Sequence, residues 1–276
     1  MNLLKKILIT LAFIFSNCFA ALVLESDKIT DILKYSDENT LVIFDVDGVV
    51  FEPLHTLGND PWAYYEAGKF IKSAGGDVVK GLTAFCPVWV DVREKVDVKL
   101  VSNNILDVLT ELEEKNIKII GLTARGIPLI RKTKEQFDSL GLDFIKNNYH
   151  EKDEVCDLFD LKNGVMFIEI GVDKGKCLKR FFEIAGKKPK KIVFIDDRMK
   201  NIKSLNKTCQ ELSIDFVGIR YSATDNSVEN FDGKVGDIQL YFLNEYGYFL
   251  NDDQAKDMFM FFENLIENGG DFDRQI

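Results

Sequence analysis

The feature that most constrains the fold is an alternation of short apolar runs with segments of helical periodicity. Apolar runs of strand length occupy Leu41 to Phe44, Ile117 to Leu122 and Ile192 to Ile195, and each is bounded by polar residues. Between the first two runs, apolar side chains recur at helical spacing, at Ile105, Val108, Leu109 and Leu112. Strands that alternate with helices are typical of a doubly wound α/β fold with a mostly parallel sheet, and we expect that fold here.

Two further helices are predicted between the later apolar runs. One covers Pro128 to Leu140, and the other covers Lys174 to Ala185. Gly186 follows the second helix directly, and glycine is a common residue at the end of a helix. Together with the strands, these helices extend the α/β pattern toward the C-terminus.

The pattern is interrupted between the first strand and the helix that follows it. Residues 51–101 form a stretch too long for a plain loop, and it carries both tryptophans, Trp62 and Trp89. We expect a small, mainly helical cap inserted at the carboxyl ends of the strands, where open α/β sheets bind ligands. The core would then consist of residues 21–50 and 102–276, with the apolar C-terminal stretch after Asn251 docked against the sheet.

The N-terminus has the pattern of an export signal. Lys5 and Lys6 precede an apolar run from Ile7 to Phe15, and small residues lead to Ala20. We expect residues 1–20 to be a cleaved signal peptide and the mature protein to be periplasmic or secreted. The alternative is an uncleaved anchor, but the run is well short of the roughly 20 residues that span a bilayer, so stable membrane insertion is not expected.

Charge argues against nucleic acid as a partner. The chain carries 35 Lys and Arg against 45 Asp and Glu, a formal net charge of −10, and it has no basic run long enough to neutralise a phosphate backbone. Hydrophobic residues make up 46% of the sequence, which is enough for a conventional buried core.

Acidic residues directly follow the first and last apolar runs. Asp45 and Asp47 come after the first strand with Gly48 behind them, and Asp196 and Asp197 come after the last. A carboxylate pair delivered by a strand can supply a nucleophile and a general acid and base to one reacting centre. Taken alone, Asp and Gly after a strand are ordinary turn residues.

Other groups converge on the same edge of the predicted sheet. Thr123 ends the second apolar run, Lys174 and Lys176 open a helix, and Asp196 and Asp197 supply the carboxylate oxygens that Mg²⁺ prefers. An acid pair, a hydroxyl, a lysine and a second acid pair, each at the end of a strand or the start of a helix, indicate phosphoryl chemistry.

At these residues the chain resembles the haloacid dehalogenase superfamily, most of whose members are Mg²⁺-dependent phosphatases. The resemblance lies in four segments in the family's order, and it spans residues 41 to about 220. The segments are FDVDGV (44–49), Leu122 to Arg125, Lys174 in DKGKCL, and FIDDRMKN (194–201). The family's fold is a Rossmann-like α/β core with an inserted cap, so the resemblance implies the same fold class as the pattern of elements.

The resemblance also implies a role for each matching residue. Asp45 would be the nucleophile that becomes an aspartyl phosphate, and Asp47 the acid that protonates the leaving group and later activates water. Thr123 would hold the phosphoryl group and Lys174 would neutralise charge, with Lys176 as the rival lysine. Mg²⁺ would bind Asp45, the backbone carbonyl of Asp47, and Asp197, with Asp196 nearby. The family often has an acid where this chain has Asn201, a departure that would weaken the binding of the metal.

The resulting expectation is an exported Mg²⁺-dependent phosphatase that acts on small phosphorylated compounds. Two alternatives stay open: a catalytically weak or inactive binding or effector module, and a phosphomutase, which shares the aspartyl phosphate. The substrate, the oligomeric state and a host-protein target are not fixed by the sequence. Neither histidine is assigned to catalysis, no zinc site is expected, and the disulfide pairing of the four cysteines that follow residue 20 stays open.

Overall fold

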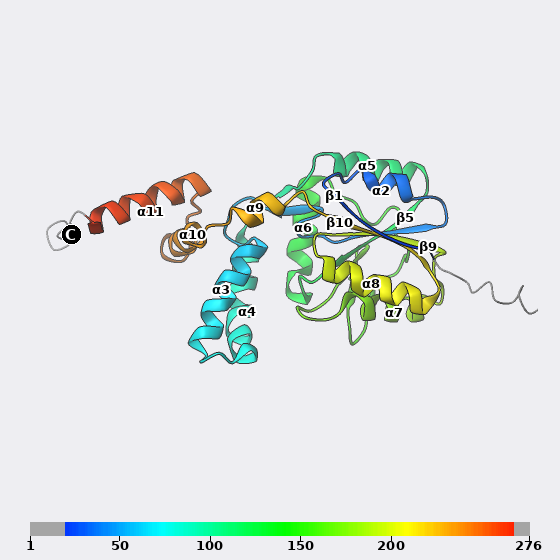
Figure 1. Cartoon of the computed structure of the whole chain (residues 1–276), viewed down its shortest axis with the longest axis horizontal. Coiled ribbons are helices and arrows are strands. Elements are labelled where there is room, and N and C mark those ends of the chain that lie inside the picture. Colours follow the sequence, from blue (N-terminus) through cyan, green and yellow to red (C-terminus); the bar gives the residue numbers. More distant parts are fainter. Residues whose placement is uncertain (1–19, 268–276) are drawn as a thin grey trace, which may run out of the picture. The chain divides into compact units, whose positions relative to one another are not determined.

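The computed structural model describes residues 20–267, and these divide into two compact units (Figure 1). The first unit, which we call the α/β unit, combines the chain up to Val46 with Asn104–Gly126 and Asp143–Ser222. The second, which we call the helical unit, combines Asp47–Asn103, Ile127–Leu142 and the chain from Ala223 onward. The predicted signal peptide lies outside the described residues except for Ala20, so it stays a prediction.

The α/β unit is built on an eight-stranded sheet with the strand order β1-β10-β9-β2-β5-β8-β7-β6. Neighbours run parallel from β1 to β8 along that order, and the β8-β7-β6 edge is antiparallel. The predicted α/β fold with a mostly parallel sheet is confirmed. The strands are β1 (Ala21–Ser26), β2 (Thr40–Phe44), β5 (Lys118–Thr123), β6 (Glu154–Val155), β7 (Asp160–Lys162), β8 (Val165–Phe167), β9 (Lys191–Asp196) and β10 (Asp215–Tyr221).

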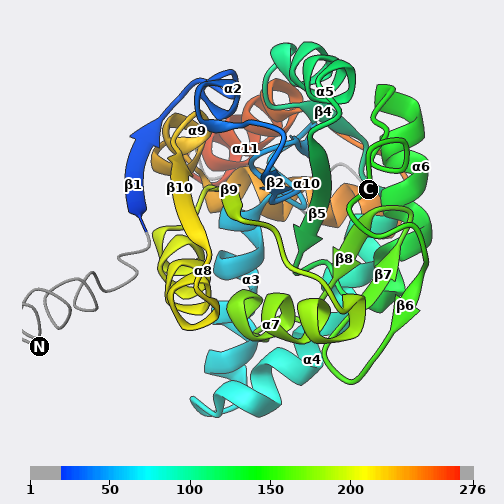
Figure 2. The ribbon, with the colours of Figure 1, turned by 90° about the vertical axis from the view of Figure 1, so that its right-hand side faces the viewer.

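Helices cover both faces of this sheet. In Figure 2, α2 (Asp31–Tyr35) and α5 (Asn104–Glu114) lie on one side, and α7 (Lys174–Ala185) and α8 (Met199–Leu212) lie on the other. The strands β2, β5 and β9 are buried on both faces, which explains their continuous apolar sequences. Alternate residues of these strands pack with the apolar faces of α7 and α8 in one large core: Leu41, Ile43, Ile120, Leu122, Ile192, Phe194, Leu178, Phe181, Ile202 and Leu205.

In the first segment of the helical unit, one short strand precedes the helices and a second follows them, and the two pair as an antiparallel ribbon. The ribbon pairs β3 (Phe51–Pro53) with β4 (Val98–Leu100), and between them the chain forms the helices α3 (Asp60–Ser73) and α4 (Val78–Lys95). Asn59 and Asp77 accept hydrogen bonds from backbone N–H groups at the starts of these two helices. The remaining elements are η1 (Ile127–Leu129), α6 (Ile130–Leu140), α9 (Asp225–Glu229), α10 (Gly233–Tyr246) and α11 (Asp252–Glu267).

Helix α10 shares a core with the predicted cap rather than with the sheet. Leu243 of α10 packs in the same buried cluster as Trp62 and Trp89. A Cβ atom at Gly236 would lie 2.6 Å from Cδ1 of Trp62, so α10 approaches this ring closely. The side chain of Gln239, fully buried, accepts a hydrogen bond from the backbone N–H of Leu57 at 2.8 Å.

The structure therefore draws the boundary differently from the sequence expectation, which placed all of 102–276 with the sheet. Residues 127–142 and the described chain from Ala223 group with 51–101, and α11 packs against α10. The helical unit is correspondingly larger than the predicted cap. Helical periodicity reports that a helix has an apolar face, but it does not report which other element that face meets.

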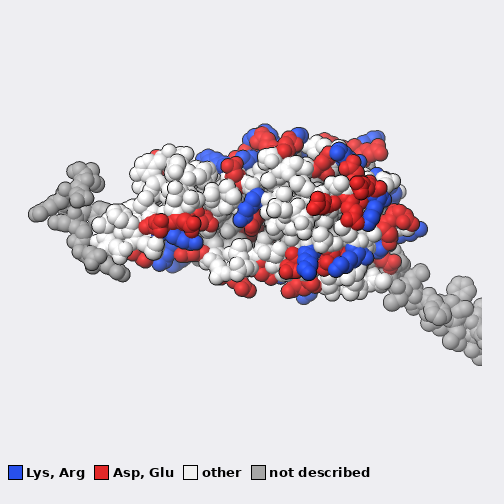
Figure 3. All heavy atoms as spheres, turned by 90° about the horizontal axis from the view of Figure 1, so that it is seen from above, with Lys and Arg blue, Asp and Glu red and all other residues white. Residues whose placement is uncertain are grey.

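Two surface properties complete the description. Acidic and basic side chains lie beside one another over the part of the α/β unit that faces the viewer in Figure 3. Among the described helices, none combines the length and the apolar character needed to cross a membrane.

Candidate functional site

The candidate site lies at the carboxyl ends of three adjacent parallel strands. The register pairs Phe44 at the end of β2 with Ile195 of β9 and with Gly121 of β5. Because β2 lies between β9 and β5, the residues that follow these positions emerge at one edge of the sheet. The backbone N–H of Asp45 donates to the carbonyl oxygen of Ile195 at 3.0 Å, which ties the end of β2 to the end of β9.

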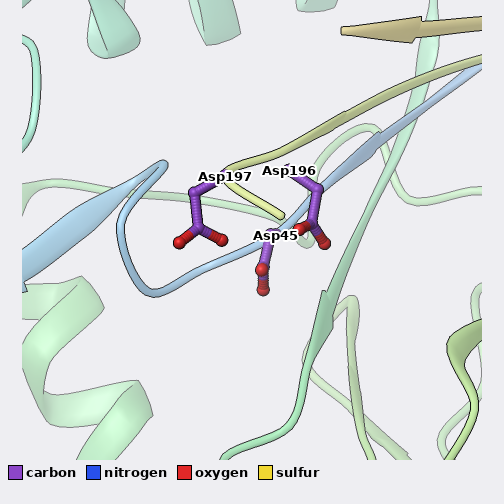
Figure 4. Close-up of side chains that lie close together, drawn as sticks. All are labelled: Asp45, Asp196 and Asp197. Atoms are coloured by element: carbon purple, nitrogen blue, oxygen red, sulfur yellow. The ribbon is translucent and has the colours of Figure 1, made fainter. Parts of the chain in front are cut away.

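Three carboxyl groups gather at this edge. Asp45, Asp196 and Asp197 each offer an oxygen, and the three oxygens lie within 4.8 Å of one another (Figure 4). Asp196 is fully buried, Asp45 is buried, and the side chain of Asp197 keeps 19% of its surface exposed. Buried carboxylates at this separation repel one another unless cations compensate them.

Lys174 supplies one of these cations from the first position of α7. Its Nζ lies 2.8 Å from Oδ1 of Asp45 and 2.7 Å from Oδ2 of Asp196, and only 4% of the residue is exposed. Burial opposes its charge, but the carboxylates of Asp196 and Asp45 outweigh that effect and hold the pKa of Lys174 above its ordinary value. Lys176, the rival, is exposed, so Lys174 is the lysine that contacts the nucleophile predicted from the sequence.

The electrostatics of Asp45 reflect this crowding. Burial and then the negative charge of Asp196 raise the pKa of Asp45 well above its usual range, while Lys174 acts in the opposite direction. One oxygen of Asp45 also accepts a hydrogen bond from the backbone N–H of Val46 at 2.7 Å. Any further cation placed among these carboxylates would favour the ionised form of Asp45.

Asp196 has both carboxylate oxygens occupied by donors. Oδ1 accepts from the backbone N–H of Arg198 at 2.8 Å, and Oδ2 accepts from Lys174. The side-chain amide of Asn201 lies 2.9 Å from Oδ1 and 3.0 Å from Oδ2. Asn201, which stands where the family resemblance would often place an acid, therefore binds Asp196. This arrangement suits Asp196 to holding Lys174 in place.

A hydrogen-bonded clamp fixes the start of α7 on α8. The hydroxyl of Ser204 accepts from the backbone N–H of Gly175 at 3.1 Å and donates to Asp173 at 2.8 Å. Asp173 in turn accepts from the backbone N–H of Lys176 at 2.9 Å, as the cap of the helix. A Cβ atom on Gly175 would lie 2.5 Å from Oγ1 of Thr208, so glycine permits the close approach that places Lys174.

Thr123 and Asp47 complete the residues predicted from the sequence. Thr123 is buried at the end of β5, and its hydroxyl accepts from the backbone N–H of Arg125 at 3.3 Å. Asp47 belongs to the helical unit, where its carboxylate forms an ion pair with Arg93 of α4. The structure thus gathers Asp45, Lys174, Asp196 and Asp197 closely, with Thr123 at the end of an adjacent strand.

The ion pair at Asp47 includes a second acid. Nη2 of Arg93 lies 2.9 Å from Oδ1 of Asp60, at the start of α3, while Nη1 contacts Asp47. Burial opposes the charge of Arg93, but the two carboxylates more than compensate and raise the pKa of the guanidinium. Sequence reasoning did not find Arg93. Its signal would have been an arginine next to the apolar positions Phe85, Trp89 and Val92 of one helix face.

The cysteines and histidines stay outside this site. Cys86, Cys156, Cys177 and Cys209 are all free thiols in the described structure. His150 contacts Glu154 at 3.0 Å, and His55 stacks on Phe249.

Comparison with known proteins places these residues in a family. Residues 24–256 match the model of a family described as proteins of unknown function, DUF2608. A Chlamydia pneumoniae protein named as a candidate outer membrane protein is 26% identical over 228 residues, which are 77% of this chain and 82% of that protein. An uncharacterised Rickettsia prowazekii protein is 21% identical over 248 residues, which are 85% of this chain and 88% of the relative.

Solved structures with a similar arrangement include two described as haloacid dehalogenase-like. A hydrolase of that family from Streptococcus pneumoniae has a TM-score of 0.39 at 10% identity, covering 65% of this chain and 93% of its own. The HAD domain of a Legionella pneumophila effector protein has a TM-score of 0.36 at 13% identity, covering 70% and 95%. Since the sequence match covers most of the chain, the protein belongs to the DUF2608 family.

Proposed function

We propose that the protein is an exported, metal-dependent phosphatase that hydrolyses phosphate monoesters through an aspartyl phosphate on Asp45. The observation that carries the proposal is the bridge of Lys174 between Asp45 and Asp196, with Asp197 alongside, at the ends of adjacent parallel strands. A module that only binds a partner has no physical need to bury a nucleophile, a lysine and further acids in one cluster.

The donor set fits Mg²⁺. Three carboxylate oxygens within 4.8 Å of one another are of the type that this ion prefers. Asp45, Asp197 and the backbone carbonyl of Asp47 would hold the ion, while Asp196 is engaged by Lys174 and Asn201. A bound Mg²⁺ would supply positive charge that offsets the repulsion between a carboxylate and a phosphoryl group.

The chain's own residues account for the remaining requirements of the reaction. An oxygen of Asp45 attacks phosphorus, and the bond from phosphorus to the leaving oxygen breaks while Asp47 gives that oxygen a proton. Lys174 offsets charge on Asp45 as the two anionic groups approach, and Thr123 orients a phosphoryl oxygen. Asp47 then takes a proton from water, which attacks the phosphorus of the aspartyl phosphate and releases inorganic phosphate and free Asp45.

Export is part of the proposal. It rests on the basic, apolar and small-residue segments of residues 1–20. The Chlamydia relatives, which are named as candidate outer membrane proteins, support a location outside the cytoplasm. Mass analysis of protein recovered from an exporting host should find a mature chain that begins at Ala21, and a chain that begins at Met1 would contradict export with cleavage.

The catalytic proposal is tested with the purified mature chain and an aryl phosphate. We expect hydrolysis that requires Mg²⁺ and is lost in Asp45→Asn, which keeps the shape of the side chain but removes most of its nucleophilicity. Lys176→Ala, at an exposed position of the helix that carries Lys174, is the control and should retain full activity. A wild type that hydrolyses no ester in a broad panel of phosphates would overturn the proposal in favour of a binding module.

A further inference from the structure

The strongest feature outside the acid cluster is the buried arginine of the helical unit. Arg93 is 1% exposed, and its two terminal nitrogens contact different carboxylates, Nη1 that of Asp47 and Nη2 that of Asp60. Its guanidinium also lies over the ring of Trp89, 5.4 Å from the ring centroid. Burying an arginine this deeply is strongly unfavourable unless its charge is compensated, and the two carboxylates compensate it and fix the terminal nitrogens, while Nε is buried without a hydrogen-bond partner among the described residues.

The backbone of Asp47 is fixed as well. The N–H of Gly48 donates to the carbonyl oxygen of Phe51 at 3.0 Å, and a bridge pairs Asp47 with Phe51. Gly48 has a φ of 75°, a conformation that side-chain-bearing residues rarely adopt. A tight turn thus holds the main chain of Asp47, and Arg93 holds its carboxylate.

We propose that Arg93 is a positioning residue for Asp47, which it holds in one orientation for proton transfer. This inference rests on the proposed function, because it takes Asp47 as the acid and base of that reaction. The planar guanidinium reaches two carboxylates at once, and Asp60 at the start of α3 anchors its far side. A lysine retains the charge but does not provide this fork, so Arg93→Lys separates geometry from charge.

The choice of leaving group distinguishes positioning from mere stabilisation of the fold. An alkyl phosphate needs a proton on its leaving oxygen, whereas 2,4-dinitrophenyl phosphate departs without one. We expect Arg93→Lys to lower kcat/KM for an alkyl phosphate about 10- to 100-fold, the range of a misplaced catalytic group, and to leave kcat/KM for the dinitrophenyl ester nearly unchanged. Asp47→Asn should show the same selectivity, because it removes the acid itself.

Coupling between the two positions gives a second readout. In an Asp47→Asn background, Arg93→Lys should cause no further loss with the alkyl ester, since its effect passes through Asp47. Arg131→Lys is the matched control, because Arg131 also bridges two acids, Glu94 and Glu135, but is exposed. We expect this control to keep full activity with both esters.

The experiment therefore measures kcat/KM for both esters in the full mature chain and its variants. If Arg93→Lys does not fold, Asp60→Asn replaces it, because it removes the charge of the anchor while leaving Arg93 and Asp47 present. Equal losses with both esters, or losses that add in the Asp47→Asn background, would overturn the positioning role alone. A wild type that turns over neither ester would overturn the proposed function and this inference with it.

Discussion

At the scale of single residues, the site depends on how its charges compensate one another. Lys174 lies between two buried carboxylates, and Asp197, which is more exposed, lies beside them. Removing a charge from such a set has two costs, one for the chemistry and one for folding, because the remaining charges stay buried without a partner. These two costs differ among the residues of the cluster, and so they can be separated by substitution.

Lys174→Ala should reduce both activity and stability. It leaves Asp45 and Asp196 facing each other in the buried cluster, so we expect the free energy of unfolding to fall by about 3–5 kcal/mol and kcat/KM to fall at least about 100-fold. Urea denaturation and steady-state kinetics measure the two effects. In Lys176→Ala, stability should change by less than about 0.5 kcal/mol, as is usual for a surface substitution. Equal effects of the two substitutions would contradict the assignment of Lys174.

Asp197→Asn should act on the metal rather than on the fold. Its carboxylate is partly exposed, and we place it among the Mg²⁺ ligands, so the Mg²⁺ concentration that gives half-maximal activity should rise. Asp196→Asn should instead destabilise the protein, because Asp196 accepts hydrogen bonds from Lys174, Arg198 and Asn201. If the Mg²⁺ concentration that gives half-maximal activity rose in Asp196→Asn and not in Asp197→Asn, Asp196 rather than Asp197 would be the metal ligand.

At the scale of elements, the packing of α7 on α8 is what sets the position of Lys174. Ser204 bonds to the residues on either side of Lys174, and Gly175 allows the two helices to approach closely. The two helices therefore carry part of the site although only Lys174 contacts the acids.

Gly175→Ala should destabilise the protein although alanine favours helices. The added Cβ would lie 2.5 Å from Oγ1 of Thr208 and 2.6 Å from Oγ of Ser204, so the helices must separate, at a cost of about 1–3 kcal/mol. Gly68→Ala is the control, since Gly68 lies in α3 and its added Cβ would have no atom within 4 Å apart from its chain neighbours and the backbone of its own helix, and it should stabilise by about 0.5–1 kcal/mol. Thermal unfolding compares them, and a Gly175→Ala variant as stable as wild type would contradict the close-packing account.

What the sequence predicts well is where the residues at the ends of its apolar runs lie in the fold. Asp45, Thr123 and Asp196 each end an apolar run, and parallel strands bring such ends to one edge whatever else the fold contains. The pairing of Arg93 with Asp47 joins residues 46 positions apart and depends on the packing of α4, which no local pattern reports. The role of Asn201 was missed for a similar reason, because its identity alone does not show that it binds Asp196.

At the scale of the whole molecule, the two units differ in how well the sequence predicts which segments belong to each. The order of strands and helices predicts the α/β unit, whereas the helical unit gathers three separate segments around Trp62 and Trp89. Amphipathic helices such as α6 and α10 would satisfy the same periodicity on the sheet or on the cap. Their place follows from side-chain packing, of which the contact between Gly236 and Trp62 is one example.

Thiol reactivity should report this packing in solution. Burial raises the pKa of Cys177 and of Cys209 to about 12, so at pH 8 both should resist iodoacetamide in the folded protein, while exposed Cys86 is alkylated readily. Mass spectrometry of peptides after timed labelling measures each site, and labelling in urea supplies the reference for full access. Rapid alkylation of Cys209 in the native protein would contradict the core packed between α8 and the sheet.

The central claim is that Asp45 becomes phosphorylated. It is tested most directly by mixing the Asp47→Asn variant with 2,4-dinitrophenyl phosphate and Mg²⁺, quenching in acid, and locating the phosphoryl group by peptide mass spectrometry. Because this ester needs no acid to depart and the variant lacks the base that activates water, the phosphoenzyme should form and persist. The account predicts a phosphoryl group on Asp45 in the Asp47→Asn variant. It predicts no phosphoryl group at that position in the double variant that carries both Asp45→Asn and Asp47→Asn. Phosphate released at the wild-type rate by a protein that lacks the Asp45 carboxylate would contradict it.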